Sequence, residues 1–310
     1  MADTQVLPDG VSVFERGWLS SNNILIQGRD QAALIDSGYA THSDQTVSLV
    51  KSALGGRPLD LLLNTHLHSD HCGGNAALQK TWSGVRTLIP PGQAEHVVHW
   101  DPVALTYLPT GQQCPRFDID GLLEPGAEIQ LGDARWQIHG APGHDPHSIV
   151  LFEPLSRTLI SADALWESGF GIVFPELEGD SAFDEVARTL DVIESLRPYC
   201  VIPGHGRVFT AAGGGVDRAL LAARSRLDSF MGDPVRHARH AAKVLLKFKL
   251  LELQQLPYGE MRRWALDTPY FRLIHDRYFC GDLGSWIDSL VEELERAGAA
   301  RRTGLLILNA

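Results

Sequence analysis

The chain has 310 residues, of which 44% are hydrophobic and 21% charged, and its formal net charge is −11. This composition is typical of a globular protein with one large or two modest domains, and it excludes collagen-like and low-complexity classes. The longest apolar runs are far shorter than the roughly 20 residues that span a bilayer. Thirteen His, against seven Trp and six Tyr, are the unusual feature of the composition.

The first two hundred residues alternate between short apolar runs and helical patterns. Apolar runs bounded by turn residues are typical of buried strands. We expect strands at Val11–Phe14, Asn23–Gln27, Ala33–Asp36, Asp60–Asn64, Trp136–His139, Ile149–Phe152, Leu159–Ser161 and Tyr199–Ile202. Helical spacing of apolar residues predicts helices at about 43–54 and 182–196. The pattern therefore predicts an α/β fold class.

Beyond the Gly-rich segment Thr210–Gly215 the chain becomes mostly helical. Helices are predicted at about 217–230, 234–255, 258–267 and 284–297, and a last strand at Leu305–Leu308. Helices followed by a short hairpin suit a small winged-helix-like module. We therefore expect a catalytic domain at 1–215 and a helical C-terminal domain at 216–310.

The strongest motif is Thr65-His66-Leu67-His68-Ser69-Asp70-His71, which directly follows the predicted strand at 60–64. In an extended segment, residues i and i+2 point the same way, so His66 and His68 can bind one metal ion together. Asp70 and His71 follow the turn and can point at a second ion. Neutral imidazole and carboxylate suit zinc, with iron and manganese as alternatives.

Three further potential ligands stand at the ends of short apolar runs, next to Gly or Pro. They are His144 in Ala-Pro-Gly-His, Asp163 in Ser-Ala-Asp, and His205 in Pro-Gly-His-Gly. A lone His at a strand end is usually an ordinary core or surface residue. Five His and two Asp in this order and context favour a site for two divalent ions.

These motifs resemble those of the metallo-β-lactamase superfamily, whose HxHxDH pattern is intact here. The resemblance covers about residues 8–210 and implies an αββα sandwich with a binuclear metal centre at one edge. The ligands that it implies are His66, His68 and His144 for one ion, Asp70, His71 and His205 for the other, and Asp163 as the bridge. Asp36 matches a position that supports the site from behind the ligands.

The resemblance implies a hydrolase in which two cations lower the pKa of a water toward ~7. Asp70 and Asp163 are then the catalytic carboxylates, and Asp70 can orient the nucleophile and handle the proton. We expect a small ester or thioester substrate, as in glyoxalase II-like thioesterases and related lactonases. An endoribonuclease or phosphodiesterase is the alternative, and a non-catalytic binding module with a vestigial site is a more distant one.

The charge distribution bears on the choice of substrate. Residues 217–310 carry 15 Lys and Arg against 12 Asp and Glu, so the acidic excess lies in residues 1–216. Arg236, Arg239, Lys243 and Lys247 recur at helical spacing and form a basic stripe. This stripe either meets phosphates of RNA or coenzyme A, or is a solvated helix face. An acidic catalytic part repels polyanions, so a nucleic-acid partner is not favoured.

Several other residues carry two interpretations. His147 is either a substrate contact or a surface loop residue, and Trp166 and Phe170 either line the substrate pocket or pack in the core. His96 and His99 are spaced like a metal pair but lack an acidic or Cys partner, so we interpret them as surface residues. Segment 90–123 is a candidate lid. The N-terminal residues show no signal peptide, so we expect a cytoplasmic protein without a membrane partner.

Overall fold

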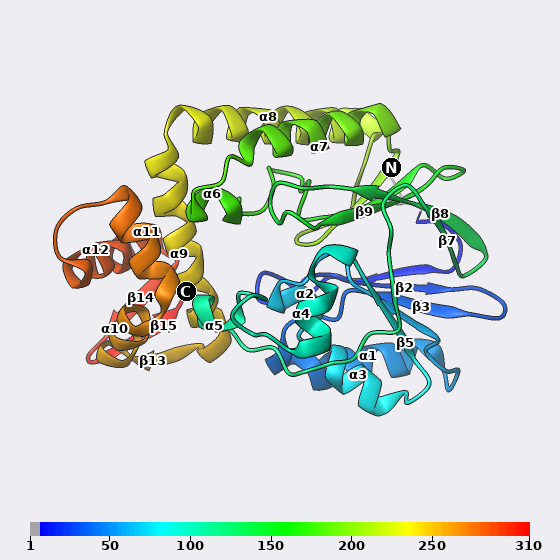
Figure 1. Cartoon of the computed structure of the whole chain (residues 1–310), viewed down its shortest axis with the longest axis horizontal. Helices are drawn as coiled ribbons and strands as arrows, with labels where there is room; N and C mark the ends of the chain where they lie inside the picture. The colour runs from blue at the N-terminus through cyan, green and yellow to red at the C-terminus, as the bar shows by residue number, and fades with distance from the viewer. Residues whose placement is uncertain (1–6) are drawn as a thin grey trace.

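The computed structural model describes residues 7–310, so the first six residues of the predicted domain 1–215 lie outside the described residues. Two six-stranded sheets pack face to face (Figure 1). The first sheet has the order β1-β2-β3-β4-β5-β6. Its strands are β1 (Val11–Phe14), β2 (Asn23–Gln27), β3 (Ala32–Ile35), β4 (Leu61–Leu63), β5 (Arg86–Ile89) and β6 (Gly121–Leu122). Strands β3 to β6 are parallel.

The second sheet has the order β12-β11-β10-β9-β8-β7. Its strands are β7 (Glu128–Leu131), β8 (Ala134–Gly140), β9 (Ile149–Glu153), β10 (Thr158–Ala162), β11 (Cys200–Pro203) and β12 (Phe209–Thr210). Strands β10 and β11 are parallel, with Ile160 opposite Ile202. Because the carboxyl ends of parallel neighbours meet at one edge of a sheet, residues that follow these strands are brought together.

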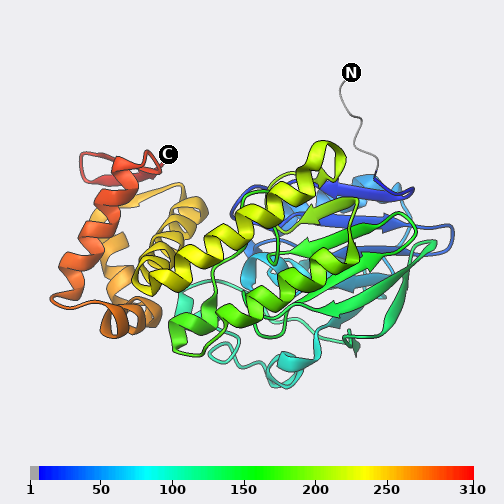
Figure 2. The ribbon, with the colours of Figure 1, turned by 90° about the horizontal axis from the view of Figure 1, so that it is seen from above.

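Helices cover the outer face of each sheet. Figure 1 shows α1 (Ser43–Leu54) and α3 (Asn75–Thr81) on the first sheet, and Figures 1 and 2 show α7 (Phe183–Leu196) and α8 (Gly215–Gly232) on the second. Between the sheets lies a core of buried side chains that includes Trp136, Leu63 and Ile202. Burial of each such side chain stabilises the fold by about 1.5–3 kcal/mol. The predicted αββα sandwich is confirmed.

The C-terminal part combines four helices with a small antiparallel sheet of order β13-β15-β14. Its elements are α9 (Pro234–Leu253), β13 (Gln255–Pro257), α10 (Tyr258–Asp267), α11 (Pro269–Tyr278), α12 (Leu283–Arg296), β14 (Ala300–Thr303) and β15 (Leu306–Asn309). The helical C-terminal part is confirmed. Helix α11 was not expected from the sequence. Only Thr268 separates it from α10, and Pro269 suits the first turn of a helix.

Helix α8 contacts α7, and its apolar residues Ala219, Leu220 and Ala223 belong to the same buried cluster as Val186 and Leu190 of α7. The boundary that we placed at 215/216 stays a prediction. Among the helices of residues 7–310, none is long and apolar enough to cross a membrane.

The remaining elements are short and lie in the connections. They are η1 (Ala40–His42), α2 (Ser69–Cys72), η2 (Pro91–Gln93), α4 (Ala94–His99), α5 (Tyr107–Thr110), α6 (Phe174–Glu178) and η3 (Ala212–Gly214). Segment 90–123 contacts the C-terminal helices, because α5 packs against α11 and Gln113 donates to Glu252 of α9. The candidate lid is therefore held from two sides, by the sandwich and by α9.

Candidate metal centre

The seven predicted ligands converge at the edge where the parallel strands end. His66 and His68 follow β4, and Asp70 and His71 lie in the short helix α2 directly after them. The other three come from the second sheet and are His144 in the β8–β9 loop, Asp163 after β10 and His205 after β11. The chain thus brings residues up to 139 positions apart into one cluster of donor atoms.

Three groups of donor atoms each lie within 4.8 Å of one another. They are His66, His68 and His144; Asp70, His71 and His205; and His66, His71 and Asp163. The first two correspond to the two ligand sets that the resemblance implies. Asp163 lies between them, with its Oδ1 3.5 Å from His71 Nε2 and its Oδ2 3.5 Å from His144 Nε2.

Backbone carbonyls orient two of the imidazoles. His144 Nδ1 donates to the carbonyl of Ile172 at 2.5 Å, and His205 Nδ1 donates to the carbonyl of Gly17 at 2.9 Å. Because a carbonyl can only accept, Nδ1 carries the proton and the lone pair of Nε2 faces the centre. This is the tautomer that binds a cation through Nε2.

The carboxylate of Asp36, directly after β3, orients the imidazole of His71. Its Oδ2 accepts from His71 Nδ1 at 2.7 Å, while its two oxygens accept from the backbone and hydroxyl of Thr65 at 2.9 and 2.8 Å. Strand register makes this contact, because Ile35 and Leu63 are neighbours in adjacent parallel strands. The resemblance implied that Asp36 lies behind the potential ligands, and the structure brings its carboxylate against Nδ1 of His71.

Small residues leave room for these side chains. A Cβ atom on Gly204 would lie 2.1 Å from Asp163 Oδ1, and one on Gly171 would lie 2.3 Å from His144 Nδ1. Real Cβ atoms do not approach other atoms so closely. The Gly before His205 is therefore required by the close approach of its backbone to the carboxylate.

The donor set fits divalent cations. His66 Nε2 and His71 Nε2 are buried and have no hydrogen-bond partner among the described residues. Buried polar atoms are nearly always paired, so these two nitrogens, aimed at the same cluster, need another partner. Imidazole nitrogens and carboxylate oxygens together match the ligands of zinc, and also those of iron or manganese.

Electrostatics within the cluster favour the same conclusion. Burial, together with neighbouring imidazoles, lowers the pKa of His66 well below its usual value and that of His144 to about 4. Burial opposes the His71 cation, but three carboxylates outweigh it and raise the pKa of His71. Burial also opposes ionisation of Asp163, yet His205 and His71 lower its pKa. A cation that binds His71 therefore displaces a proton, so acid weakens binding.

A pocket of about 240 Å³ opens over the centre. On one side it is lined by donor residues, namely His68, Asp70, His144, Asp163 and His205. Its other walls are mostly apolar and come from the sandwich loops (Trp18, Trp166, Ile172 and Phe174) and from α9 (Val244, Leu245 and Phe248). Segment 90–123 contributes Thr106, Thr110 and Gln112, in keeping with its interpretation as a lid.

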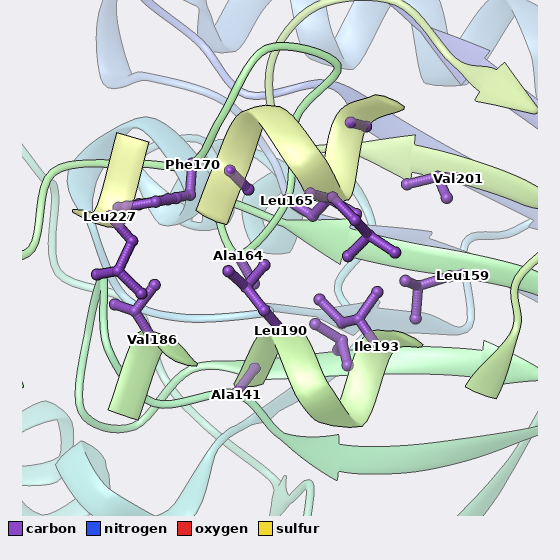
Figure 3. Close-up of a cluster of buried hydrophobic side chains, with 14 of the residues drawn as sticks. Ala141, Leu159, Ala164, Leu165, Phe170, Val186, Leu190, Ile193, Val201 and Leu227 are labelled. Atoms are coloured by element: carbon purple, nitrogen blue, oxygen red, sulfur yellow. The ribbon is translucent and has the colours of Figure 1, made fainter. Parts of the chain in front are cut away.

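The sequence left two interpretations open for Trp166, Phe170 and His147, and the structure gives these three residues different surroundings. Trp166 lines the pocket, and its Nε1 donates to Asp163 Oδ1 at 3.2 Å. Phe170 is 1% exposed and packs in the core near Leu227 and Val186 (Figure 3), so it does not contact a substrate in this pocket. His147 is exposed and lies in an adjoining hollow that shares His68 with the pocket.

The basic stripe is not an open phosphate-binding face. Arg239 and Lys243 both contact the Glu293 carboxylate of α12, with Lys243 Nζ 3.0 Å from Oε2. Lys247 donates to the backbone carbonyl of Ala299 at 2.6 Å. Three of the four stripe cations thus have partners within the C-terminal part, two on α12 and one at the residue before β14.

Sequence reasoning missed two residues of the site. Trp18, in the loop between β1 and β2, stacks on His205 with ring centroids 5.5 Å apart. Asp145, which is 4% exposed, has a carboxylate oxygen 3.7 Å from His68 Nε2. Asp145 directly follows a predicted ligand, which was a usable signal, whereas Trp18 belongs to no motif. The histidines His96 and His99 join none of the donor groups among the described residues.

Comparisons with known proteins agree with this geometry. The chain is 31% identical over 162 residues to a hydroxyacylglutathione hydrolase of Anaeromyxobacter dehalogenans, a match that covers 51% of this chain and 52% of that protein. It is 22% identical over 182 residues to YybB of Bacillus subtilis, a probable metallo-hydrolase, covering 58% and 78% of the two chains. The chain thus spans about half the length of the first of these relatives.

Solved structures show the same fold. A metallo-beta-lactamase from Cronobacter sakazakii superposes with a TM-score of 0.58 at 17% identity, covering 74% of this chain and 93% of that one. The metallo-beta-lactamase family protein TTHA1429 from Thermus thermophilus superposes with a TM-score of 0.55 at 19% identity, covering 98% and 99%. A model of the metallo-beta-lactamase superfamily matches residues 16–205, which is more than half of the chain. The chain belongs to the metallo-beta-lactamase superfamily.

Proposed function

We propose that this protein is a binuclear metal-dependent hydrolase that cleaves a small ester or thioester. One observation carries the proposal: three donor groups that share residues lie together, and five of their seven residues line one small pocket whose other walls are largely apolar. Zinc is the metal that we favour for both ions. The relatives named hydroxyacylglutathione hydrolases and metallo-hydrolases support hydrolysis as the reaction. We propose a thioester substrate because the first of these names indicates one.

The first ion would be held by His66, His68 and His144, the second by Asp70, His71 and His205, with Asp163 shared between them. When bound, such a pair supplies Lewis acidity and makes a water nucleophilic at neutral pH. No Ser or Cys nucleophile is then required.

The chain's own residues position the reactants. Asp70 Oδ2 lies 3.1 Å from His205 Nε2, within the second donor group. Burial opposes ionisation of Asp70, but His71 and His205 outweigh it and lower its pKa. The ionised Oδ2 can accept a proton from the attacking water and pass it to the leaving group. Trp18, Trp166 and Phe174 hold apolar substrate atoms and exclude bulk water.

Nuclease activity is the weaker candidate. A polyanion needs a cationic track beside the centre. Here three of the four stripe residues are engaged inside the C-terminal part, and residues 1–216 carry the acidic excess. The apolar pocket walls suit an acyl chain better than a phosphodiester backbone.

A substrate panel tests the proposal. Protein loaded with zinc, and separately with manganese or iron, is assayed with S-lactoylglutathione, an acyl-coenzyme A, a lactone and single-stranded RNA. We expect hydrolysis of at least one thioester or ester and metal content near two ions per chain. Cleavage of RNA alone, a fully loaded protein inert to all four, or less than one ion per two chains would each contradict the proposal.

A further inference from the structure

Arg226 of α8 is a cation in the pocket wall without an acidic partner. Its Nη2 lies 2.9 Å from His240 Nε2, and this is the only hydrogen bond of the Arg226 side chain among residues 7–310. Its Nε is buried and has no partner there. Burial lowers the pKa of Arg226, and no neighbouring carboxylate offsets this effect. Arg226 is partly buried, and a cation in such a place without a counter-charge can bind an anion.

The guanidinium is held in place by its neighbours. Its Cζ lies 5.2 Å from the ring centroid of Phe230 and 5.7 Å from that of Phe170. A Cβ on Gly169 would lie 2.8 Å from Arg226 Cδ, so the side chain occupies space that only Gly leaves free. Stacking of this kind attracts the cation to the rings but satisfies none of its N–H donors.

His240 orients Arg226 as a neutral acceptor. Burial, followed by the nearby charges of Arg226, Lys243 and Arg236, lowers the pKa of His240 to about 4. At neutral pH its Nε2 therefore accepts from Arg226 Nη2, and the remaining N–H donors of Arg226 stay available.

Arg226 and His240 stand where two hollows meet. One is the pocket over the candidate metal centre. The other, of about 820 Å³, lies on the far side of the pair and is lined by Arg236, Arg239 and Lys243. Asp233 also lines this hollow, and two of those cations share the carboxylate of Glu293, whereas Arg226 lines both hollows and has no carboxylate partner among the described residues. A substrate whose acyl group is at the metals can thus place an anionic end at Arg226.

We propose that Arg226, positioned by His240, binds a carboxylate or phosphate oxygen of the substrate, remote from the bond that is cleaved. The proposal rests on the hydrolase function above and assigns its substrate class: an ester or thioester with an anionic leaving group. Arg226 is a specificity-determining residue, because it touches neither the donor groups nor the reacting carbonyl.

Binding measurements test this assignment without requiring turnover. Zinc-loaded wild type, Arg226→Gln and Arg226→Lys are titrated calorimetrically with the S-methyl thioethers of coenzyme A and of glutathione, whose sulfur is not a thiolate ligand. S-methyl pantetheine and the diethyl ester of S-methyl glutathione are the matched ligands that lack these anions. Arg224→Gln is the control variant, since Arg224 lies on the same helix but pairs outward with Asp191 and Glu194.

We expect wild type to bind one anionic ligand about 10- to 100-fold more tightly than its matched ligand. Arg226→Gln should remove that preference, Arg226→Lys should retain part of it, and Arg224→Gln should leave it intact. The coenzyme A arm then identifies phosphate, and the glutathione arm carboxylate, as the recognised group. Circular dichroism confirms that the variants are folded.

Equal binding of anionic and matched ligands by wild type, no binding at millimolar concentration, or an equal loss for both ligands in Arg226→Gln would overturn the assignment. The last outcome is what a purely structural stacking role predicts. Because binding is measured separately from hydrolysis, an inert protein with Arg226-dependent binding contradicts only the hydrolase proposal. An active hydrolase without such binding contradicts only the assignment of Arg226.

Discussion

The two sides of the pocket are built differently. The floor consists of donor side chains that follow strands of the two sheets, and three of the seven are oriented by a backbone carbonyl or a carboxylate. The opposite wall comes from α8 and α9 and is apolar except for Arg226 and His240. In the proposed enzyme, the reacting groups lie at the edge of the sandwich, and the packed helices select the substrate.

Two buried histidines, one in the floor and one on α9, illustrate this difference. His66 on the floor is buried with an unpartnered Nε2, whereas His237 on α9 is buried with Nε2 accepting from the backbone N–H of Val173 at 3.2 Å. Both have a pKa lowered by burial. The first is neutral and free to bind a cation, while the second is neutral and already satisfied. Burial alone does not distinguish a potential ligand from a core residue. The distinction is whether Nε2 already has a hydrogen-bond partner.

Replacing His66 should produce the largest effect. His66→Ala removes a donor that belongs to two of the three groups, so we expect activity to fall to background and metal content to drop below that of wild type. Metal analysis and a thioester assay measure both. His99→Ala, on a side chain that is 76% exposed, is the matched control and should change neither. Unaltered turnover in His66→Ala would contradict the proposal that the reaction takes place at these donor groups.

His237 should affect stability and its pH dependence, with metal content preserved. Burial, reinforced by His240 and Arg226, lowers its folded pKa to about 3. The unfolded chain therefore takes up this proton first, and the stability contributed by neutral His237 is lost as pH falls from about 6.5 toward 3. Between pH 7 and pH 4 this amounts to on the order of 2–3 kcal/mol.

Denaturant unfolding of wild type and His237→Gln at several pH values tests this. Gln can still accept from Val173 but does not titrate, so the variant should lose less stability on acidification. His99→Gln serves as the exposed control. Parallel pH profiles for wild type and His237→Gln would show that the buried imidazole is not the group responsible.

A smaller effect is expected behind the ligands. Asp36→Asn preserves the shape of the side chain but weakens the contact with His71 Nδ1. Loss of such a supporting partner typically costs about 10- to 100-fold in metal affinity or activity. Titration of zinc against a competing chelator measures it, with exposed Asp30→Asn as the control. An affinity equal to that of wild type would mean that strand packing alone orients His71.

Much of the floor was predictable from local sequence. Period-2 geometry places His66 and His68 on one side, and a ligand type at the end of each apolar run predicts convergence, because parallel strands end at one edge. The strands and the helices at 43–54 and 182–196 follow from hydrophobic spacing. The wall was not predictable in the same way. The hydrophobic pattern gives Trp166 and Phe170 the same two interpretations, pocket lining or core packing, although only Trp166 of the two lines the pocket.

From residue type and hydrophobic spacing, the sequence by itself predicted an α/β fold and seven potential donors, whereas the sandwich and the supporting position of Asp36 came from the resemblance to the superfamily. Only the tertiary structure decided which helix faces close the pocket. Glu293 of α12 engages two cations of the predicted stripe, and α8 brings Arg226 against His240. Helix packing sets these partners, and the side chains that meet across two helices leave no periodic trace in either one.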